Sequence, residues 1–140
     1  MKKFAVGMVV LLVLACTVLF ARGFAWGDAP SVKSLPPTVI KTVPECGDMN
    51  VDAATTTQIK VMFCKEMMDG GWSWSQISNE TFPKINGKPK YLEDKKTCVV
   101  DVKLEPNKTY VIWLNPEKFQ GFRDTDGNPS VFYFLWFKTK

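Results

Sequence analysis

Histidine is absent from this sequence, which excludes every mechanism that needs an imidazole. The Ser-His-Asp triad, the Cys-His pair and the usual catalytic zinc site are therefore ruled out. The chain also lacks an internal repeat and a long amphipathic helical pattern. Hydrophobic residues make up 46% of the 140 residues and charged residues 23%, a composition that excludes bulk disorder and low-complexity classes. A chain of this length and composition predicts one globular domain.

The first 27 residues read as a targeting segment. Lys2 and Lys3 give a positive start, residues 4–20 carry no charge, and small residues follow. This layout is that of a secretory signal peptide. The apolar run is longer than the usual signal core, so an uncleaved membrane anchor through residues 4–20 stays open, as does lipidation at Cys16. Each alternative predicts an extracytoplasmic protein, periplasmic, secreted or membrane-anchored, that meets the membrane only through this segment if it is uncleaved.

The apparent basicity of the chain belongs to this segment. Three of the 18 basic residues lie in residues 1–27 together with none of the 14 acidic ones, leaving 15 basic and 14 acidic residues in residues 28–140. A nearly neutral chain of this kind carries no overall signature of a nucleic-acid-binding protein. We therefore expect no nucleic-acid partner.

Short strand-like patterns separated by turns fill the rest of the chain. Residues 28–37 are rich in proline and serine and predict a linker. Strand patterns then occupy residues 39–43, 58–63, 72–77, 90–92, 98–104, 109–114 and 131–138. About seven short strands with frequent turns predict an all-β sandwich over residues 38–140, preceded by the N-terminal signal or anchor helix.

Four short motifs in a fixed order carry a resemblance to a known family. They are P-P-x-V-x-x-x-x-P at residues 36–44, I-x-V-x-F at residues 59–63 followed by Met67, L-x-P-x-x-x-Y at residues 104–110, and D-x-x-G-N-P at residues 124–129. Together they resemble bacterial Ig-like domains of the S-layer-protein (SbsA-like) type over residues 36–140. The chain departs from that pattern at Cys64, where serine or aspartate is usual, and at Glu66, where proline is usual.

The resemblance implies an immunoglobulin-like β-sandwich used outside the cytoplasm as a structural or binding module without catalysis. Leu104, Pro106 and Tyr110 then form a tyrosine corner, whose hydroxyl bonds to upstream backbone. Phe63 and Met67 become structural residues of the second strand pattern and its flank. No catalytic residue, metal or cofactor is implied.

Three cysteines remain after residues 1–27, an odd number, so at least one thiol is free or pairs between chains. Cys64 ends one strand pattern and Cys98 begins another, and antiparallel pairing of those strands would bring them close. A Cys64–Cys98 disulfide is therefore one expectation for an oxidising compartment. Strict alternation opposes it, because Cys64 falls on the face opposite Phe63, so a fold without a disulfide stays open.

Aromatic residues are the strongest candidates for a binding surface. Trp72 and Trp74 lie two apart and share one face of a strand, where they either pack in the core or bind a ligand. In residues 131–138 both faces of the pattern are apolar, so one is core and the other is covered by a neighbouring segment, a partner or a membrane. We take Tyr133 and Phe137, together with the two tryptophans, as binding candidates.

The sequence leaves three functions in competition. The first is an exported, non-catalytic Ig-like module for protein interaction or structural support in the bacterial cell envelope. The second is a carbohydrate-binding module that uses Trp72 and Trp74. The third is a periplasmic Cu(I) carrier, since sulfur ligands are clustered in the second strand pattern and its flank, at Met62, Cys64, Met67 and Met68. The expected partner is an envelope protein or polysaccharide.

Overall fold

The computed structural model describes residues 30–140, in which residues 31–140 form one compact unit. The expected signal or anchor segment lies outside the described residues. Seven strands follow one another: β1 (Val39–Val43), β2 (Gln58–Phe63), β3 (Trp74–Gln76), β4 (Lys84–Tyr91), β5 (Thr97–Lys103), β6 (Thr109–Leu114) and β7 (Tyr133–Lys138). The prediction of an all-β chain with about seven strands is confirmed. Residues 30–140 contain no helix of the length and hydropathy needed to cross a membrane.

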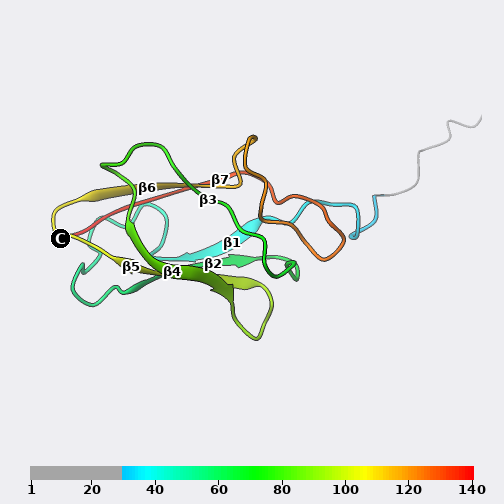
Figure 1. Ribbon diagram of the computed structural model, residues 1–140, viewed down its shortest axis with the longest axis horizontal. Helices are drawn as coiled ribbons and strands as arrows, with labels where there is room; N and C mark the ends of the chain where they lie inside the picture. The colour runs from blue at the N-terminus through cyan, green and yellow to red at the C-terminus, as the bar shows by residue number, and fades with distance from the viewer. Residues whose placement is uncertain (1–29) are drawn as a thin grey trace, which may run out of the picture. The chain divides into compact units, whose positions relative to one another are not determined.

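Two antiparallel sheets make up the fold. The strand order is β1-β2-β5-β4 in the larger sheet and β3-β6-β7 in the smaller one. Figure 1 shows the two sheets as separate layers, with β6 and β7 in one and β2, β4 and β5 in the other. The strands that contact one another across a sheet are therefore often distant in sequence, as in β2 and β5.

The core follows from strict alternation along the central strands. Ile59, Val61 and Phe63 of β2 are buried, while the residues between them are half-exposed. From the smaller sheet, β6 contributes Ile112 and Leu114. Because side chains in a strand point alternately to its two faces, each sheet presents one apolar face to the other. Burial of side chains of this size contributes about 1.5–3 kcal/mol each relative to full exposure.

The boundaries of β4 differ from the expected ones. The sequence Asn86-Gly87-Lys88-Pro89 reads as a turn, and the pattern predicted a strand over residues 90–92 alone. In the structure β4 runs through this sequence, and its register against β5 shifts between Asn86 and Lys90. Gly87 has a φ of +80°, a conformation that side chains beyond glycine rarely adopt. The turn-like residues therefore form an irregularity within a strand rather than its end.

The tyrosine motif closes the connection between β5 and β6. The hydroxyl oxygen of Tyr110 accepts a hydrogen bond from the backbone N–H of Glu105 at 2.8 Å. Tyr110 and Leu104 are buried, whereas Pro106 is exposed on the turn between them. Phe63 and Met67 are both buried as well. This local bond holds the β5–β6 turn against the core.

A segment outside the named strands pairs with the free edge of β7. The backbone N–H of Gly47 donates to the carbonyl of Trp136 at 2.8 Å, and the N–H of Lys138 donates to the carbonyl of Asp48 at 2.8 Å. Val51 forms a parallel bridge with Thr139. The early part of the domain is therefore bonded to both sheets, through β1 in one and through residues 47–51 in the other.

The expected Cys64–Cys98 disulfide is wrong, because both thiols are free. Cys98 pairs with Val61 and is buried in the core, and burial raises the pKa of its thiol to about 12. Cys64 lies beyond the end of β2 and is exposed, where its sulfur accepts a hydrogen bond from the N–H of Thr38 at 3.3 Å. Cys64 lies three residues beyond Val61, the residue opposite Cys98, and its side chain is on the other face of the sheet. The two sulfur atoms are therefore too far apart to form a disulfide.

Candidate functional site

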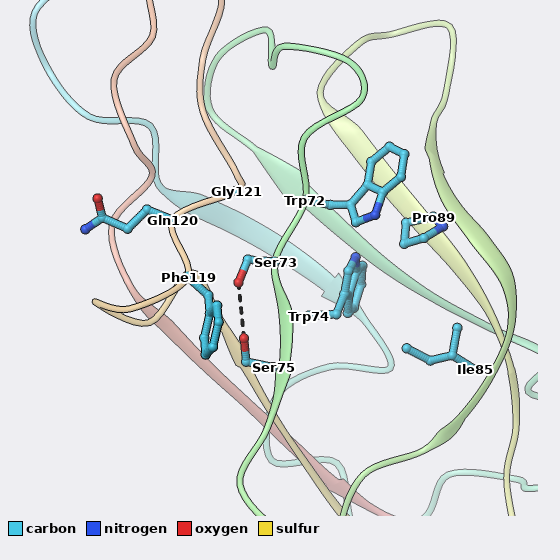
Figure 2. Close-up of a pocket in the computed structure, with 9 residues that line it drawn as sticks. All are labelled: Trp72, Ser73, Trp74, Ser75, Ile85, Pro89, Phe119, Gln120 and Gly121. Carbon is cyan, nitrogen blue, oxygen red and sulfur yellow. Dashed lines mark hydrogen bonds between the residues drawn. The ribbon is translucent and has the colours of Figure 1, made fainter.

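A groove beside β3 brings the two candidate tryptophans together. It has a volume of about 470 Å³ and is lined by Trp72, Ser73, Trp74, Ser75, Ile85, Pro89, Phe119, Gln120 and Gly121. Figure 2 shows Trp72 and Trp74 on one side of the chain, toward Ile85 and Pro89 of β4. Ser73 and Ser75 point the other way, and their hydroxyl oxygens are 3.1 Å apart. The tryptophans thus lie between the edges of the two sheets.

The groove is built from packing residues rather than from a flat binding platform. Trp74 packs edge-on against Phe122 with ring centroids 5.9 Å apart, and Phe122 packs against Phe63 at 5.1 Å. Both tryptophans are half-buried and contact the core. Figure 2 shows their rings turned differently, Trp74 edge-on and Trp72 with its face visible. Sugar rings stack on exposed, coplanar aromatic faces, and this pair does not present one.

Close backbone packing fixes the position of Trp72. A Cβ atom on Gly121 would lie 2.7 Å from the carbonyl carbon of Trp72 and closer still to its oxygen. A Cβ atom on Gly71 would likewise lie 2.6 Å from the carbonyl oxygen of Gly121. Backbone atoms cannot move aside as the end of a side chain can. Two glycines are therefore required where the 71–73 segment meets the loop before Phe122.

We expect Gly121→Ala to destabilise the domain by about 1–3 kcal/mol, because the added methyl group forces the two backbone segments apart. The same displacement moves Trp72 and changes the tryptophan fluorescence. Chemical denaturation followed by that fluorescence measures both effects. Gln120→Ala changes an exposed neighbour in the same loop and serves as the control. A Gly121→Ala protein as stable as the wild type would contradict the packing described here.

A second candidate surface is the outer face of the smaller sheet. Trp113, Phe132 and Phe134 are 37%, 48% and 42% exposed, respectively. Trp113 lies opposite Phe134 in the β6–β7 register and packs edge-on against Phe132 with centroids 5.5 Å apart. Trp136 on the same face is half-buried beside Gly47. We call Trp113, Phe132 and Phe134 the aromatic face.

Two of the expected binding residues belong to the other side of β7. Phe137 is fully buried and packs against Tyr110 with ring centroids 5.4 Å apart, so it is not available to a partner. Tyr133 is half-buried and packs against the core. The choice of Phe137 as a binding residue is therefore wrong. The register of β7 against β6 turns Tyr133, Leu135 and Phe137 inward and leaves the alternate aromatic residues outside.

One of the four sulfur-bearing residues is separated from the others by the sheet. Met67 is buried in the core, whereas Cys64 and Met68 are exposed. Among residues 30–140, no group of three or more His, Cys, Asp or Glu side chains is placed to hold a metal ion. Side chains that face opposite directions cannot share one Cu(I) ion. Met67 therefore cannot join the exposed sulfur atoms as a ligand of one Cu(I) ion.

The loop that carries the D-x-x-G-N-P motif is held by a buried carboxylate. Asp124 accepts hydrogen bonds from the backbone N–H groups of Asp126 and Asn128, and its other oxygen lies 2.7 Å from the ammonium of Lys65. Burial opposes ionisation of Asp124, but hydrogen bonds from Asn128 and Lys65 outweigh it, so its pKa falls to about 2. These bonds connect the loop to Lys65, which follows β2.

A sequence profile described as the bacterial Ig-like domain matches residues 33–139 of the chain. The chain belongs to this family. The result confirms the resemblance drawn from the four motifs, and the two sheets are thus an Ig-like sandwich.

A solved structure shares the fold of this Ig-like domain. The N-terminal part of the bacterial S-layer protein SbsC is 23% identical with a TM-score of 0.50, covering 76% of this chain and 24% of that one. The S-layer protein rSbsC(31-844) is also 23% identical, with a TM-score of 0.48, covering 75% of this chain and 14% of that one. The domain therefore spans a minor part of these larger proteins. No curated protein sequence matches the chain.

Proposed function

We propose that this Ig-like domain is a non-catalytic protein-interaction module of the bacterial cell envelope and that the aromatic face is its contact surface. The observation that carries the proposal is the exposure of three large aromatic rings side by side on one sheet. Aromatic residues dominate the binding energy of protein interfaces, and contiguous apolar patches are uncommon on monomeric proteins. The secretory layout of residues 1–27, the family, and the S-layer proteins of similar fold support the envelope location.

The surroundings of the aromatic face resemble those of an interface. Trp113 and Phe119 line a hollow of about 340 Å³ together with Glu117 and Lys118, and Phe119 is one of the most exposed hydrophobic residues of the domain. Aromatic and charged side chains thus line the same hollow. Protein interfaces commonly combine aromatic residues with neighbouring polar and charged ones.

The Trp72–Trp74 groove supports a carbohydrate-binding function less well. Trp74 is fixed against Phe122, and its indole nitrogen is buried without a hydrogen-bond partner. A ring held in this way closes the side of the sandwich. The three rings of the aromatic face are more exposed than the two half-buried tryptophans of the groove, and they do not pack in the core. We therefore favour the aromatic face as the contact surface.

Truncation of the aromatic face tests the proposal. Full-length tagged protein is crosslinked in its own cells and recovered beside a Trp113→Ala/Phe134→Ala variant. Because interface aromatics contribute about 2 kcal/mol or more each, we expect at least a tenfold loss of one specific protein from the variant. The side chains are exposed, so the variant is expected to fold, which circular dichroism checks.

Two further baits make the test specific. An Ile40→Ala/Leu92→Ala variant removes exposed apolar side chains elsewhere on the domain and is expected to retain the partner. A Trp72→Ala variant examines the groove separately. Equal recovery of the same proteins by wild type and by the Trp113→Ala/Phe134→Ala variant would refute the aromatic face as the contact surface.

A further inference from the structure

The outer face of the larger sheet is rich in lysine. Alternation and register place five lysines on it from all four strands: Lys41, Lys60, Lys84, Lys90 and Lys103. Lys84 and Lys103 lie directly opposite each other, and Lys60 and Lys90 both pair with Val99. Val99 points outward yet is 1% exposed, a burial that the aliphatic stems of its two lysine neighbours are placed to provide. We call the five residues the lysine face.

The positive charge of the lysine face is not balanced locally. Asp101 is the acidic residue at an outward position, and one of its oxygens accepts a hydrogen bond from Gln58 at 2.8 Å. Asp94 lines a hollow with Lys41 and Lys60, and both its oxygens accept hydrogen bonds from Thr97, so five lysines lie near two carboxylates. Within the described part of the chain, none of the five lysines forms an ion pair.

The opposed pair at one end of the face is unfavourable on its own. Like charges directly opposite each other destabilise an antiparallel pair. Lys84 and Lys103 also line a hollow of about 350 Å³ with Lys108, where Glu105 is the acidic residue and is 3.0 Å from the Lys108 ammonium. Three lysine side chains and only one carboxylate thus line this hollow, which leaves an excess of positive charge. An anionic ligand would relieve the excess charge at this point.

We propose that the lysine face docks a linear anionic polysaccharide that carries carboxylate or phosphate groups along its chain. Outward positions recur every two residues, about 7 Å along a strand, so the rows from Lys41 to Lys103 extend over roughly 20 Å. A linear polymer with repeated negative charges matches such a track. The proposal does not depend on the aromatic face, which belongs to the other sheet.

The composition of the face favours a polysaccharide over other polyanions. Its outward positions carry no aromatic side chain. Single-stranded nucleic acids bind by stacking on aromatic rings, and membrane-docking surfaces commonly insert Trp or Phe beside the basic residues. The exposed apolar residues beside Lys41 and Lys60, Val43 and Leu92, are aliphatic. The face instead offers Gln58 and Asn86 between the lysine rows, and such amides can bond sugar hydroxyl groups.

Binding of the full-length protein to polygalacturonate tests this proposal. We expect binding that weakens with salt, and at least a tenfold weaker affinity for a Lys84→Gln/Lys103→Gln variant. The slope of log K against log salt is expected to fall by about 1.5, since each charge contact contributes roughly 0.7–0.9 to it. The control is Lys33→Gln/Lys140→Gln, which removes the same charge from exposed positions outside the face. It is expected to bind as wild type does.

Three comparison ligands decide the outcome. Fully methyl-esterified polygalacturonate has the same backbone without the charges and is expected not to bind. Tighter binding to phosphatidylglycerol vesicles or to single-stranded DNA than to polygalacturonate would overturn the proposal in favour of a membrane or a nucleic acid. Equal weakening in the control variant, or no binding to polygalacturonate at 150 mM salt, would overturn it as well. Circular dichroism verifies that each variant is folded.

Discussion

Substitution of Asp124 by alanine is expected to lower the free energy of unfolding by about 3–5 kcal/mol. The carboxylate is 1% exposed and bonds the ammonium of Lys65 together with the backbone and side chain of Asn128. Its removal leaves a half-buried lysine without its partner and releases the loop before β7. That loop also contacts the segment before β1, because the Asn128 side-chain amide donates to the carbonyl of Lys33 at 2.6 Å.

The same carboxylate makes stability depend on pH in acid. The folded-state pKa of Asp124 is lowered from its ordinary value of 3.8 to about 2. A lowered pKa contributes stability that is fully present above the unfolded value and is lost as pH falls through the folded one. We therefore expect about 2 kcal/mol of stability to disappear between about pH 4 and pH 2.

Denaturant unfolding of wild type, Asp124→Ala and Asp126→Ala between pH 2 and pH 7 measures both effects. Asp126 is an exposed neighbour in the same loop, and its replacement is expected to change stability by less than about 0.5 kcal/mol. In Asp124→Ala, the free energy of unfolding that is lost between about pH 4 and pH 2 should be smaller than in wild type by about 2 kcal/mol. If the variant and wild type lose the same stability in acid, Asp124 is not the group responsible.

Asn115→Asp is expected to be the most destabilising change of a single atom, at about 3–5 kcal/mol at neutral pH. The Asn115 side chain is buried, and its amide nitrogen donates to the carbonyls of Phe122 and Ser130 at 3.1 and 2.9 Å. Its oxygen accepts from the N–H of Phe122 at 2.8 Å. In the variant a carboxylate oxygen faces two carbonyl oxygens in a buried site, with no donor between them.

The control for this prediction is Asn107→Asp. Asn107 and Asn115 both have a φ of 57°, but Asn107 is exposed on the β5–β6 turn. Backbone preference is therefore matched, and only burial and hydrogen bonding differ. Thermal unfolding of both variants should show a large decrease in Tm for Asn115→Asp and almost none for Asn107→Asp. Similar values for the two variants would show that the Asn115 bonds contribute little.

Alternation and turn residues account for much of what the sequence could predict. Ile59, Val61 and Phe63 alternate with polar residues, so their inward direction could be read directly. The L-x-P-x-x-x-Y spacing likewise predicts the buried Tyr110 and the bond of its hydroxyl to nearby backbone, which is that to Glu105. These are local features, determined within a few residues of the chain.

The features that could not be predicted depend on which strands become neighbours. β7 is apolar on both faces, so only its register against β6 decides that Phe137 is buried and Phe134 exposed. The lysine face illustrates the same limit. Alternation placed Lys60 and Lys103 outward, but the near-neutral charge of residues 28–140 concealed the excess on one sheet. The excess of positive charge arises because β4 pairs with β5 and brings Lys84 and Lys90 onto the same face as Lys60 and Lys103.

The pairing of residues 47–51 with β7 has a mechanical consequence. Four backbone hydrogen bonds join the two segments, from Gly47 to Trp136, Lys138 to Asp48, Val51 to Lys138 and Lys140 to Val51. Because the segments run parallel, tension between the start of the domain and its C-terminal end pulls them in opposite directions along their axes. The four bonds are then loaded together in shear, whereas a hairpin peeled from its open end breaks its bonds in succession. The last strand is in this way clamped against stretching along the chain.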